Sequence, residues 1–264
     1  MNSKINLLVI FCFLITAVSC KNEKKEHLAN NAQHETAKHW SYSGETSPEH
    51  WLEIEKNSDC DGNHQSPINI IHKNTNQVAS KGDLKILYTP TTRISEVENN
   101  GHSIQFDFET GDSINYKNET FYLKQIHFHE PSEHKINGII YPIEMHLVHV
   151  SKTGNITVLG IFGEEGEDSQ LFEFFESFLP LENGATKKIN HNIDLSSLFL
   201  NEKHYYSYGG SLTTPPCTEG VNWIVFKEPV ILSVTEVLKL KNNMPINNYR
   251  NEQPLNDREV KLNY

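Results

Sequence analysis

The sequence predicts a mainly β fold of the α+β class, formed by one large domain. With 264 residues and 37% hydrophobic content, the chain is long enough to bury one large core. Several segments of strand length have apolar residues that alternate or run without interruption. The stretches between them are short and rich in Gly, Asn, Asp and Pro. Because short connections favour antiparallel neighbours, we expect a mostly antiparallel sheet.

The expected strands come first in the domain and the expected helices follow. We predict strands over residues 102–108, 114–129, 139–151 and 155–163, with turns over 109–113, 130–138 and 151–155. Apolar residues recur at three- and four-residue spacing over 168–181, which predicts a helix. A second helix is predicted over 233–243, where Ser233 and Glu236 have the spacing of a capping box.

Composition excludes one class of partner. The chain has 23 basic and 34 acidic residues and a net charge of −11. It has no Lys/Arg cluster flanked by aromatic residues of the kind that follows a phosphate backbone. Nucleic acid is therefore not an expected partner.

The N-terminus has the pattern of an export signal. Lys4 precedes an apolar run over 5–18 that is shorter than the ~20 residues of a spanning helix, and small residues precede Cys20. The stretch "AVSC" resembles a bacterial lipobox, which makes Cys20 a predicted lipid anchor. Ala17 stands where that motif usually has Leu, so ordinary signal-peptide cleavage is the alternative.

These features divide the chain into three parts. We expect a signal peptide over 1–19, a flexible polar tether over 20–39 and the folded domain over 40–264. The predicted location is the periplasm or cell envelope, with membrane contact only through the possible lipid anchor.

Four cysteines agree with export. Cys12 lies in the leader and Cys20 at the cleavage site, which leaves Cys60 and Cys217 in the domain. In an oxidising compartment these two should form a disulfide, and two buried free thiols are the alternative.

The stretch "QIHFHEPSEH" over 125–134 concentrates three histidines. On a strand, His127 and His129 share a face. His146 lies in the next predicted strand and reaches the same point if the two strands pair antiparallel, whereas His149 should point away. Three neutral imidazoles with an open fourth position are typical of a catalytic zinc site. The alternative is that these are ordinary histidines of a polar strand.

Gln125 and Glu144 each precede a proposed ligand by two residues and share its face. A metal-bound histidine normally donates its other N–H to a carboxylate or carbonyl, so these two residues are candidates for orienting the ligands. The alternative is ordinary polar strand residues.

A series of segments, in order, gives the chain a family resemblance. They read "HWSY", "QSPINI", "NNGHSIQFDF", "QIHFHEPSEH", "EMHLVHV", "VLGIFGE", "YYSYGGSLTTPPCTEGVNWIVFKEP" and "NYRNEQPLNDR". Over about residues 40–262 the sequence resembles the α-class carbonic anhydrases, and "GGSLTTPPC" to "NWIVFKEP" is the most specific part. The resemblance implies a mostly antiparallel, twisted sheet of about ten strands with short surface helices and a cone-shaped active-site cavity.

The resemblance also implies an activity, a cofactor and site residues. The activity is zinc-dependent reversible hydration of carbon dioxide to bicarbonate and a proton, by attack of zinc-bound hydroxide. His127, His129 and His146 would bind Zn²⁺, and Thr213 would orient the hydroxide while donating its own proton to Glu133. His102 would be the proton shuttle. Residues implied to line the substrate site are Val148, Val158, Leu212, Thr214 and Trp223, and those implied to order water are Tyr42 and Asn100.

Further points also rest on the resemblance. Gln105 stands where many relatives have Asn, which should alter the ordered water rather than the reaction. A disulfide between Cys60 and Cys217 fits exported members, and a homodimer is possible because bacterial relatives often dimerise.

Two alternatives from other classes remain. In a cupin-type metal oxygenase or isomerase, Glu133 would itself bind the metal. A carbonic anhydrase-like binding module would lack catalysis, although such modules typically lose a metal histidine and this chain has all three.

Overall fold

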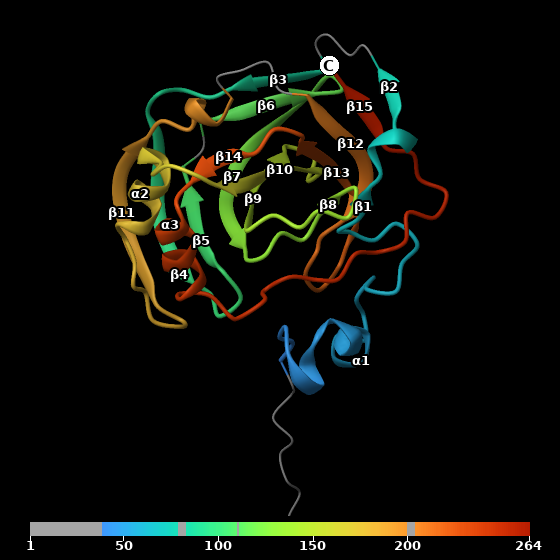
Figure 1. The fold of residues 1–264 in the computed structure, drawn as a ribbon, viewed down its shortest axis with the longest axis horizontal. Coiled ribbons are helices and arrows are strands. Elements are labelled where there is room, and N and C mark those ends of the chain that lie inside the picture. Colours follow the sequence, from blue (N-terminus) through green and yellow to red (C-terminus); the bar gives the residue numbers. More distant parts are fainter. Residues whose placement is uncertain (1–38, 79–82, 110, 200–203) are drawn as a thin grey trace, which may run out of the picture. The chain divides into compact units, whose positions relative to one another are not determined.

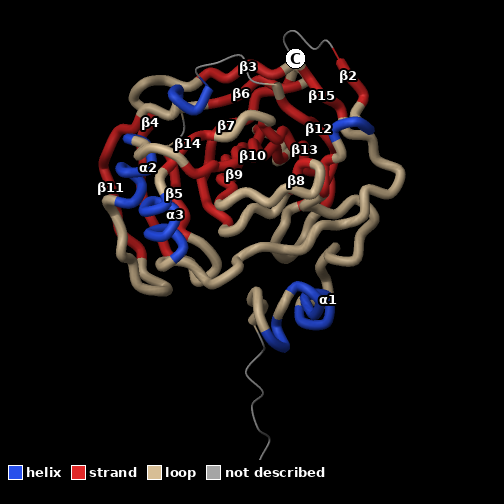
Figure 2. The backbone as a smooth tube through the Cα atoms, viewed as in Figure 1, coloured by secondary structure: helices blue, strands red, loops and turns tan. Residues whose placement is uncertain are grey.

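β-strands dominate the computed structural model, which describes residues 39–78, 83–109, 111–199 and 204–264 (Figures 1 and 2). The predicted signal peptide, the lipid-anchor residue Cys20 and all of the tether except His39 lie outside the described residues. The strands are β1 (Asn69–Ile70), β2 (Asn76–Val78), β3 (Leu84–Leu87), β4 (Thr92–Asn99), β5 (Ile104–Phe108), β6 (Ser113–Tyr116), β7 (Glu119–His129), β8 (Lys135–Ile136), β9 (Ile143–Ser151), β10 (Ile156–Glu165), β11 (Thr186–Ile193), β12 (Tyr205–Ser211), β13 (Glu219–Phe226), β14 (Val230–Leu232) and β15 (Lys261–Asn263).

Ten strands follow one another across the main sheet. Their order is β11-β4-β5-β7-β9-β10-β13-β12-β15-β2, and β3, β6 and β14 pair beside this path. Most pairs are antiparallel, but β10 pairs in parallel with β13 and β14, as β15 does with β2. β1 and β8 form a separate two-stranded sheet. The expected fold class and strand number are therefore confirmed.

The predicted strand over 114–129 is two strands in the structure. A two-residue turn at Lys117 and Asn118 separates β6 from β7, and both residues have positive φ, 49° and 64°. Positive φ at both central residues is the geometry of the tight turn that suits a twisted hairpin. The next strand begins later than predicted, at Ile143, directly after Pro142, because a proline cannot donate to the ladder.

Short helices complete the fold, and both predicted helices are confirmed. They are α1 (Trp51–Ile54), α2 (Gln170–Glu176) and α3 (Val234–Lys241), with 3₁₀ helices at Gly44–Thr46, Pro48–His50, His72–Asn74 and Ser196–Phe199. α3 has the predicted capping box between Ser233 and Glu236. None of the helices in the described part of the chain has the length and apolar character needed to span a membrane.

The two faces of strand β7 have different environments. Ile126 and Phe128 are fully buried in the larger of two apolar clusters. A bulge at Lys124 interrupts the pairing with β9 between Leu123 and Gln125, which changes the alternation along the strand. Beyond the bulge, the odd-numbered residues Gln125, His127 and His129 lie on the face opposite Ile126 and Phe128.

The predicted disulfide is confirmed. Cys60 and Cys217 are bonded, with their Cα atoms 4.9 Å apart, across 157 residues of sequence. It fixes the segment after α1 to the loop that follows β12.

Candidate metal centre

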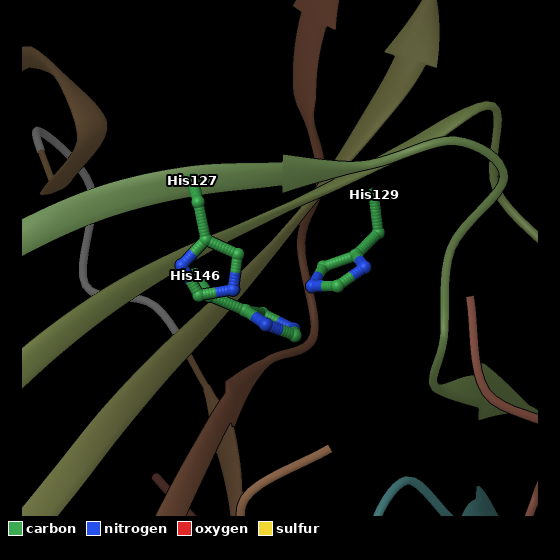
Figure 3. A group of neighbouring side chains, drawn as sticks. All are labelled: His127, His129 and His146. Atoms are coloured by element: carbon green, nitrogen blue, oxygen red, sulfur yellow. The ribbon is translucent and has the colours of Figure 1, made fainter. Parts of the chain in front are cut away.

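Three histidines from two neighbouring strands converge on one point (Figure 3). His127 on β7 is directly opposite His146 on β9, and His129 is two residues further along β7. One ring nitrogen from each lies within 4.8 Å of the others. His129 and His146 are both 1% exposed, whereas His127 is only partly buried, so the group is open to solvent on the side of His127.

Each of these rings is held through its other nitrogen. Nδ1 of His127 is 2.7 Å from Gln125 Oε1, and Nε2 of His146 is 2.9 Å from Glu144 Oε1. His129 Nδ1 is 2.6 Å from the carbonyl oxygen of Asn248. Since all three partners are acceptors, each neutral ring has its N–H at the bonded nitrogen and its lone pair at the other.

The electrostatic environment favours the neutral, metal-binding form. Burial lowers the pKa of His127 well below its ordinary value, and His129 and His146 lower it further. Burial also lowers the pKa of His129, although Glu133 opposes that shift. His129 Nε2 is buried and has no hydrogen-bond partner in the described part of the chain. An unpaired buried nitrogen facing two others fits a zinc ligand set.

Glu144 connects the ligand strand β9 to the loop after β7. Its Oε2 accepts from the backbone N–H groups of Glu133 and His134, at 2.9 and 2.8 Å. Its Oε1 accepts from His134 Nδ1 at 2.7 Å as well as from His146. Burial would raise the pKa of Glu144, but His134 and His146 hold it well below its ordinary value.

His134 and Asn248 are functional residues that the sequence argument missed. His134 is fully buried and accepts at Nε2 from the Tyr208 hydroxyl, 2.6 Å away. His134 lies between β7 and β8, so the argument that alternate residues of a strand share a face could not connect it with the ligands. Asn248 acts through its carbonyl, which any residue has, and so leaves no signal in the sequence. Its side chain also bonds the backbone of Glu130, His102 and Phe128.

Glu133 lies beside the triad with only one oxygen engaged. Oε1 accepts from the backbone N–H group of Arg250 at 2.9 Å. Oε2 is buried 3.5 Å from His129 Nε2, and none of the described residues bonds to it. Thr213 is also buried, but the hydrogen bond expected from it to Glu133 is not formed among the described residues.

An apolar wall borders the triad on the β9–β10–β13 part of the sheet. Val158 on β10 is opposite Val148 on β9 and Trp223 on β13. Leu212 packs against the same apolar cluster. The Trp223 indole donates to the Ser211 carbonyl at 2.9 Å, which fixes the ring. The structure therefore brings together all four apolar residues assigned to the substrate site.

A cavity of about 110 Å³ opens next to the histidines. It is lined by Trp40, Tyr42, Asn100, His102, Ser103, Gln105, Gln125, His127, His129 and Thr214. Asn100 Oδ1 accepts from the backbone N–H groups of His102 and Ser103, both at 2.9 Å, and its Nδ2 donates to Gln105 at 3.4 Å. Burial and nearby Glu133 raise the pKa of Tyr42 well above its usual value, so its hydroxyl stays protonated.

His102 lies at this cavity in an aromatic cluster. Its ring stacks on Trp40, with centroids 3.6 Å apart and an interplanar angle of 13°. Its Nε2 is 3.1 Å from Nε2 of His39. Burial, followed by His39, lowers the pKa of His102 to about 4, below the ordinary imidazole value on which the shuttle prediction was based.

A buried set of three imidazoles with one open side, on a mainly antiparallel sheet, defines a zinc metalloenzyme site. A profile of the family "Eukaryotic-type carbonic anhydrase" matches residues 46–264. The chain belongs to this carbonic anhydrase family. Zinc is the metal typical of the family, and the triad is present to bind it. Membership excludes the cupin alternative.

Individual relatives agree with this assignment. The carbonic anhydrase of Klebsiella pneumoniae is 40% identical over 228 residues, which cover 85% of this chain and 91% of that protein. The structure of an α-carbonic anhydrase from Thermovibrio ammonificans with the inhibitor sulfanilamide superposes with a TM-score of 0.80 at 41% identity, covering 84% of this chain and 98% of that one. A structure of dioscorin complexed with ascorbate gives a TM-score of 0.77 at 30% identity, covering 85% and 98%.

Proposed function

We propose that this protein catalyses the reversible hydration of carbon dioxide to bicarbonate and a proton, with zinc held by His127, His129 and His146. The observation that carries the proposal is the convergence of three ring nitrogens whose opposite nitrogens are all bonded to acceptors. The names of the related enzymes support the same activity. Zinc at this site supplies Lewis-acid chemistry that makes water a nucleophile at neutral pH, for which carbonic anhydrases are the standard example.

Thr213 and Glu133 would orient the nucleophile. A hydroxyl has one proton, so donating it to Glu133 leaves Thr213 only able to accept from the attacking oxygen. The bond is not formed among the described residues, but the buried Glu133 Oε2 is an acceptor with room for one donor, which supports Thr213 as that donor. The Arg250 N–H holds the other oxygen, so the carboxylate cannot turn freely.

Carbon dioxide would bind against the wall formed by Val148, Val158, Leu212 and Trp223. Carbon dioxide is apolar, and a dry wall excludes competing water without requiring hydrogen bonds. Thr214 lines the cavity next to His127 and His129 and would contact the substrate from the open side.

The proton released by the reaction would leave through His102. The position of His102 on the cavity that contains His127 and His129 supports this role. Tyr42, Asn100 and Gln105 line the same cavity and would order the intervening water.

The cellular context is also part of the proposal. The disulfide between Cys60 and Cys217 supports an oxidising compartment. We place the protein in the periplasm or cell envelope, attached through a lipid at Cys20. Labelling with a radioactive fatty acid, comparing Cys20→Ala with the native chain, tests the anchor.

The activity is tested by stopped-flow hydration of carbon dioxide, with zinc measured on the same sample. We expect about one zinc per chain and fast hydration, with loss of both in His146→Ala. His191→Ala removes an exposed histidine on β11 and is the matched control. Sulfanilamide, the inhibitor in the related structure, should suppress the activity. Bound zinc without hydration would mean a binding module and would refute the proposal.

A further inference from the structure

His39 is an exposed histidine next to the cavity residue His102. The two Nε2 atoms are 3.1 Å apart, within hydrogen-bond distance for two imidazoles of which one has an N–H at that position. The ring centroids are 5.1 Å apart. His39 is the last residue of the predicted tether, and a polar tether predicts no contact with a residue of the cavity.

The two nitrogens of His102 differ in what they can reach. Nδ1 is buried and has no hydrogen-bond partner among the residues that the structure describes, whereas Nε2 contacts His39. The ring is also held by its stacking on Trp40. With the ring in this position, Nε2 is the nitrogen of His102 that meets another titratable side chain, and that side chain is an exposed imidazole.

We propose that His39 is a second proton-relay residue, which accepts the proton from His102 and passes it to the buffer. This inference rests on the proposed hydration activity and on His102 as its shuttle. In the transfer, the N–H bond at His102 Nε2 breaks and one forms at His39 Nε2, and the positive charge moves with the proton. His39 then loses one proton to a buffer base, which restores both neutral rings.

The surroundings of His102 favour release of a proton, and the contact at Nε2 places His39 where it can accept it. Burial and the neighbouring His39 lower its pKa to about 4, so a proton on His102 is readily given up in this position. Of the side chains in ring contact with His102, the titratable ones are His39 and Tyr42. The raised pKa of Tyr42 keeps that hydroxyl from accepting the proton instead.

The kinetic test compares His39→Ala, His102→Ala and the double variant in zinc-loaded enzyme. In dilute buffer, His39→Ala should lower kcat several-fold and leave kcat/KM unchanged, because only the proton-transfer step is affected. Added imidazole buffer should restore kcat. The double variant should be no slower than His102→Ala, because relays in series are not additive. The matched control is His50→Ala, which removes another exposed histidine from the N-terminal part of the domain.

Two results would overturn the relay. One is an unchanged kcat for His39→Ala in dilute buffer while His102→Ala is slow, and the other is additive losses in the double variant. Absence of hydration in the unmodified enzyme would instead refute the proposed function. The contact is tested independently of activity by long-range ¹H–¹⁵N spectra of the imidazole nitrogens. His102 Nε2 should shift in His39→Ala and not in His50→Ala, and an unshifted resonance would refute the contact.

Discussion

At the scale of single residues, the proposed roles at the metal centre depend on which polar side-chain atoms already have a hydrogen-bond partner. Glu133 has one oxygen bonded to the Arg250 N–H and one without a donor. The family resemblance assigns the hydroxyl of Thr213 to this carboxylate. The proposed role of Thr213 therefore depends on its hydroxyl and not on its size.

Replacement of Thr213 by valine tests this dependence, because valine keeps the shape and removes the hydroxyl. We expect Thr213→Val to lower kcat/KM for hydration by roughly 100-fold, the lower end for losing a proton-directing group. Thr213→Ser should retain most of the activity, and both variants should bind zinc normally. Full activity in Thr213→Val would contradict the assigned role.

His149 illustrates a buried histidine with a structural role. It lies on β9 opposite Leu123, away from the triad as predicted, and it is fully buried. Its Nδ1 donates to the Leu147 carbonyl at 2.9 Å, and its Nε2 accepts from the Tyr88 hydroxyl at 2.6 Å. Burial lowers its pKa from 6.5 to about 4, despite opposing backbone hydrogen bonds. The folded state thus holds His149 neutral where the unfolded chain would be protonated.

This shift predicts a pH dependence of the free energy of unfolding. Above pH 6.5 His149 is neutral in both the folded and the unfolded state, so it does not change the free energy of unfolding. As the pH falls from 6.5 to 4, the unfolded chain takes up a proton that the folded state excludes, so on the order of 3 kcal/mol of stability is lost. Urea unfolding across this range should show a shallower acid slope for His149→Gln. Tyr88→Phe keeps the titrating ring and should keep the slope, and equal slopes in all three proteins would contradict the prediction.

Much of the ligand set could be predicted from single residues and their spacing. His127 and His129 share a face by strand parity, and His146 joins them through antiparallel pairing. Asn248 could not be predicted, because its contribution is a backbone carbonyl brought in from a distant loop. The contact between His39 and His102 was equally hidden, since 63 residues separate the two.

At the scale of secondary-structure elements, β7 shows where pattern analysis fails. Buried apolar residues occupy positions 121 and 123 and then 126 and 128, because the bulge at Lys124 adds one residue. Parity arguments are therefore valid only on one side of the bulge, and residues 125–129 all lie on the same side. The turn at Lys117 and Asn118 was missed for a different reason, because it contains neither Gly nor Pro to mark it in the sequence.

Glu236 connects the N-termini of two helices. Its Oε2 accepts from the Ser233 N–H at 2.6 Å in the capping box of α3. The same carboxylate accepts from the N–H of Ser169, the N-cap of α2, at 3.0 and 3.2 Å. The side chain is 2% exposed, so water cannot readily replace it.

This double role predicts an ordering of helix-cap variants. Ser233→Ala should lower the free energy of unfolding by about 1 kcal/mol, the usual contribution of an N-cap residue. Glu236→Ala should cost more, about 2 to 3 kcal/mol, because it leaves two backbone N–H groups unsatisfied. Glu173→Ala, an exposed first-turn residue of α2, should change stability by less than about 0.5 kcal/mol. Urea unfolding measures the stability of all three variants. A Glu236→Ala protein as stable as Ser233→Ala would argue against the shared cap.

At the scale of the whole molecule, distant segments are joined around the loop that carries Thr213. The disulfide holds this loop to Cys60, and Arg250 bonds the Cys60 carbonyl at 2.8 Å and the Gln65 side chain at 2.7 Å. Gln65 in turn donates to the Cys217 carbonyl at 3.2 Å. Local patterns cannot predict the bonds of Arg250 and Gln65 or the parallel β10–β13 pair, whereas the cysteine count predicted the disulfide and the resemblance predicted the ten-strand sheet.

Removal of the disulfide should affect stability and activity together. Closing 157 residues constrains the unfolded chain by up to about 4 to 5 kcal/mol on the loop-entropy model. We expect the Cys60→Ser, Cys217→Ser double variant to unfold at lower urea concentration and to lose part of its hydration rate as the Thr213 loop loosens. Unchanged stability and activity would show that Arg250 and Gln65 alone hold the loop.

The four hydrogen bonds accepted by Glu144 set a limit for anyone who wishes to transplant this centre into another protein. Three histidines placed on an unrelated antiparallel pair would reproduce the ligand atoms but not the bonds that aim them. The smallest portable unit is β7, its following loop and β9, because Glu144 fastens that loop to the ligand strand. Even this unit is incomplete, because the carbonyl that aims His129 comes from Asn248, 119 residues away.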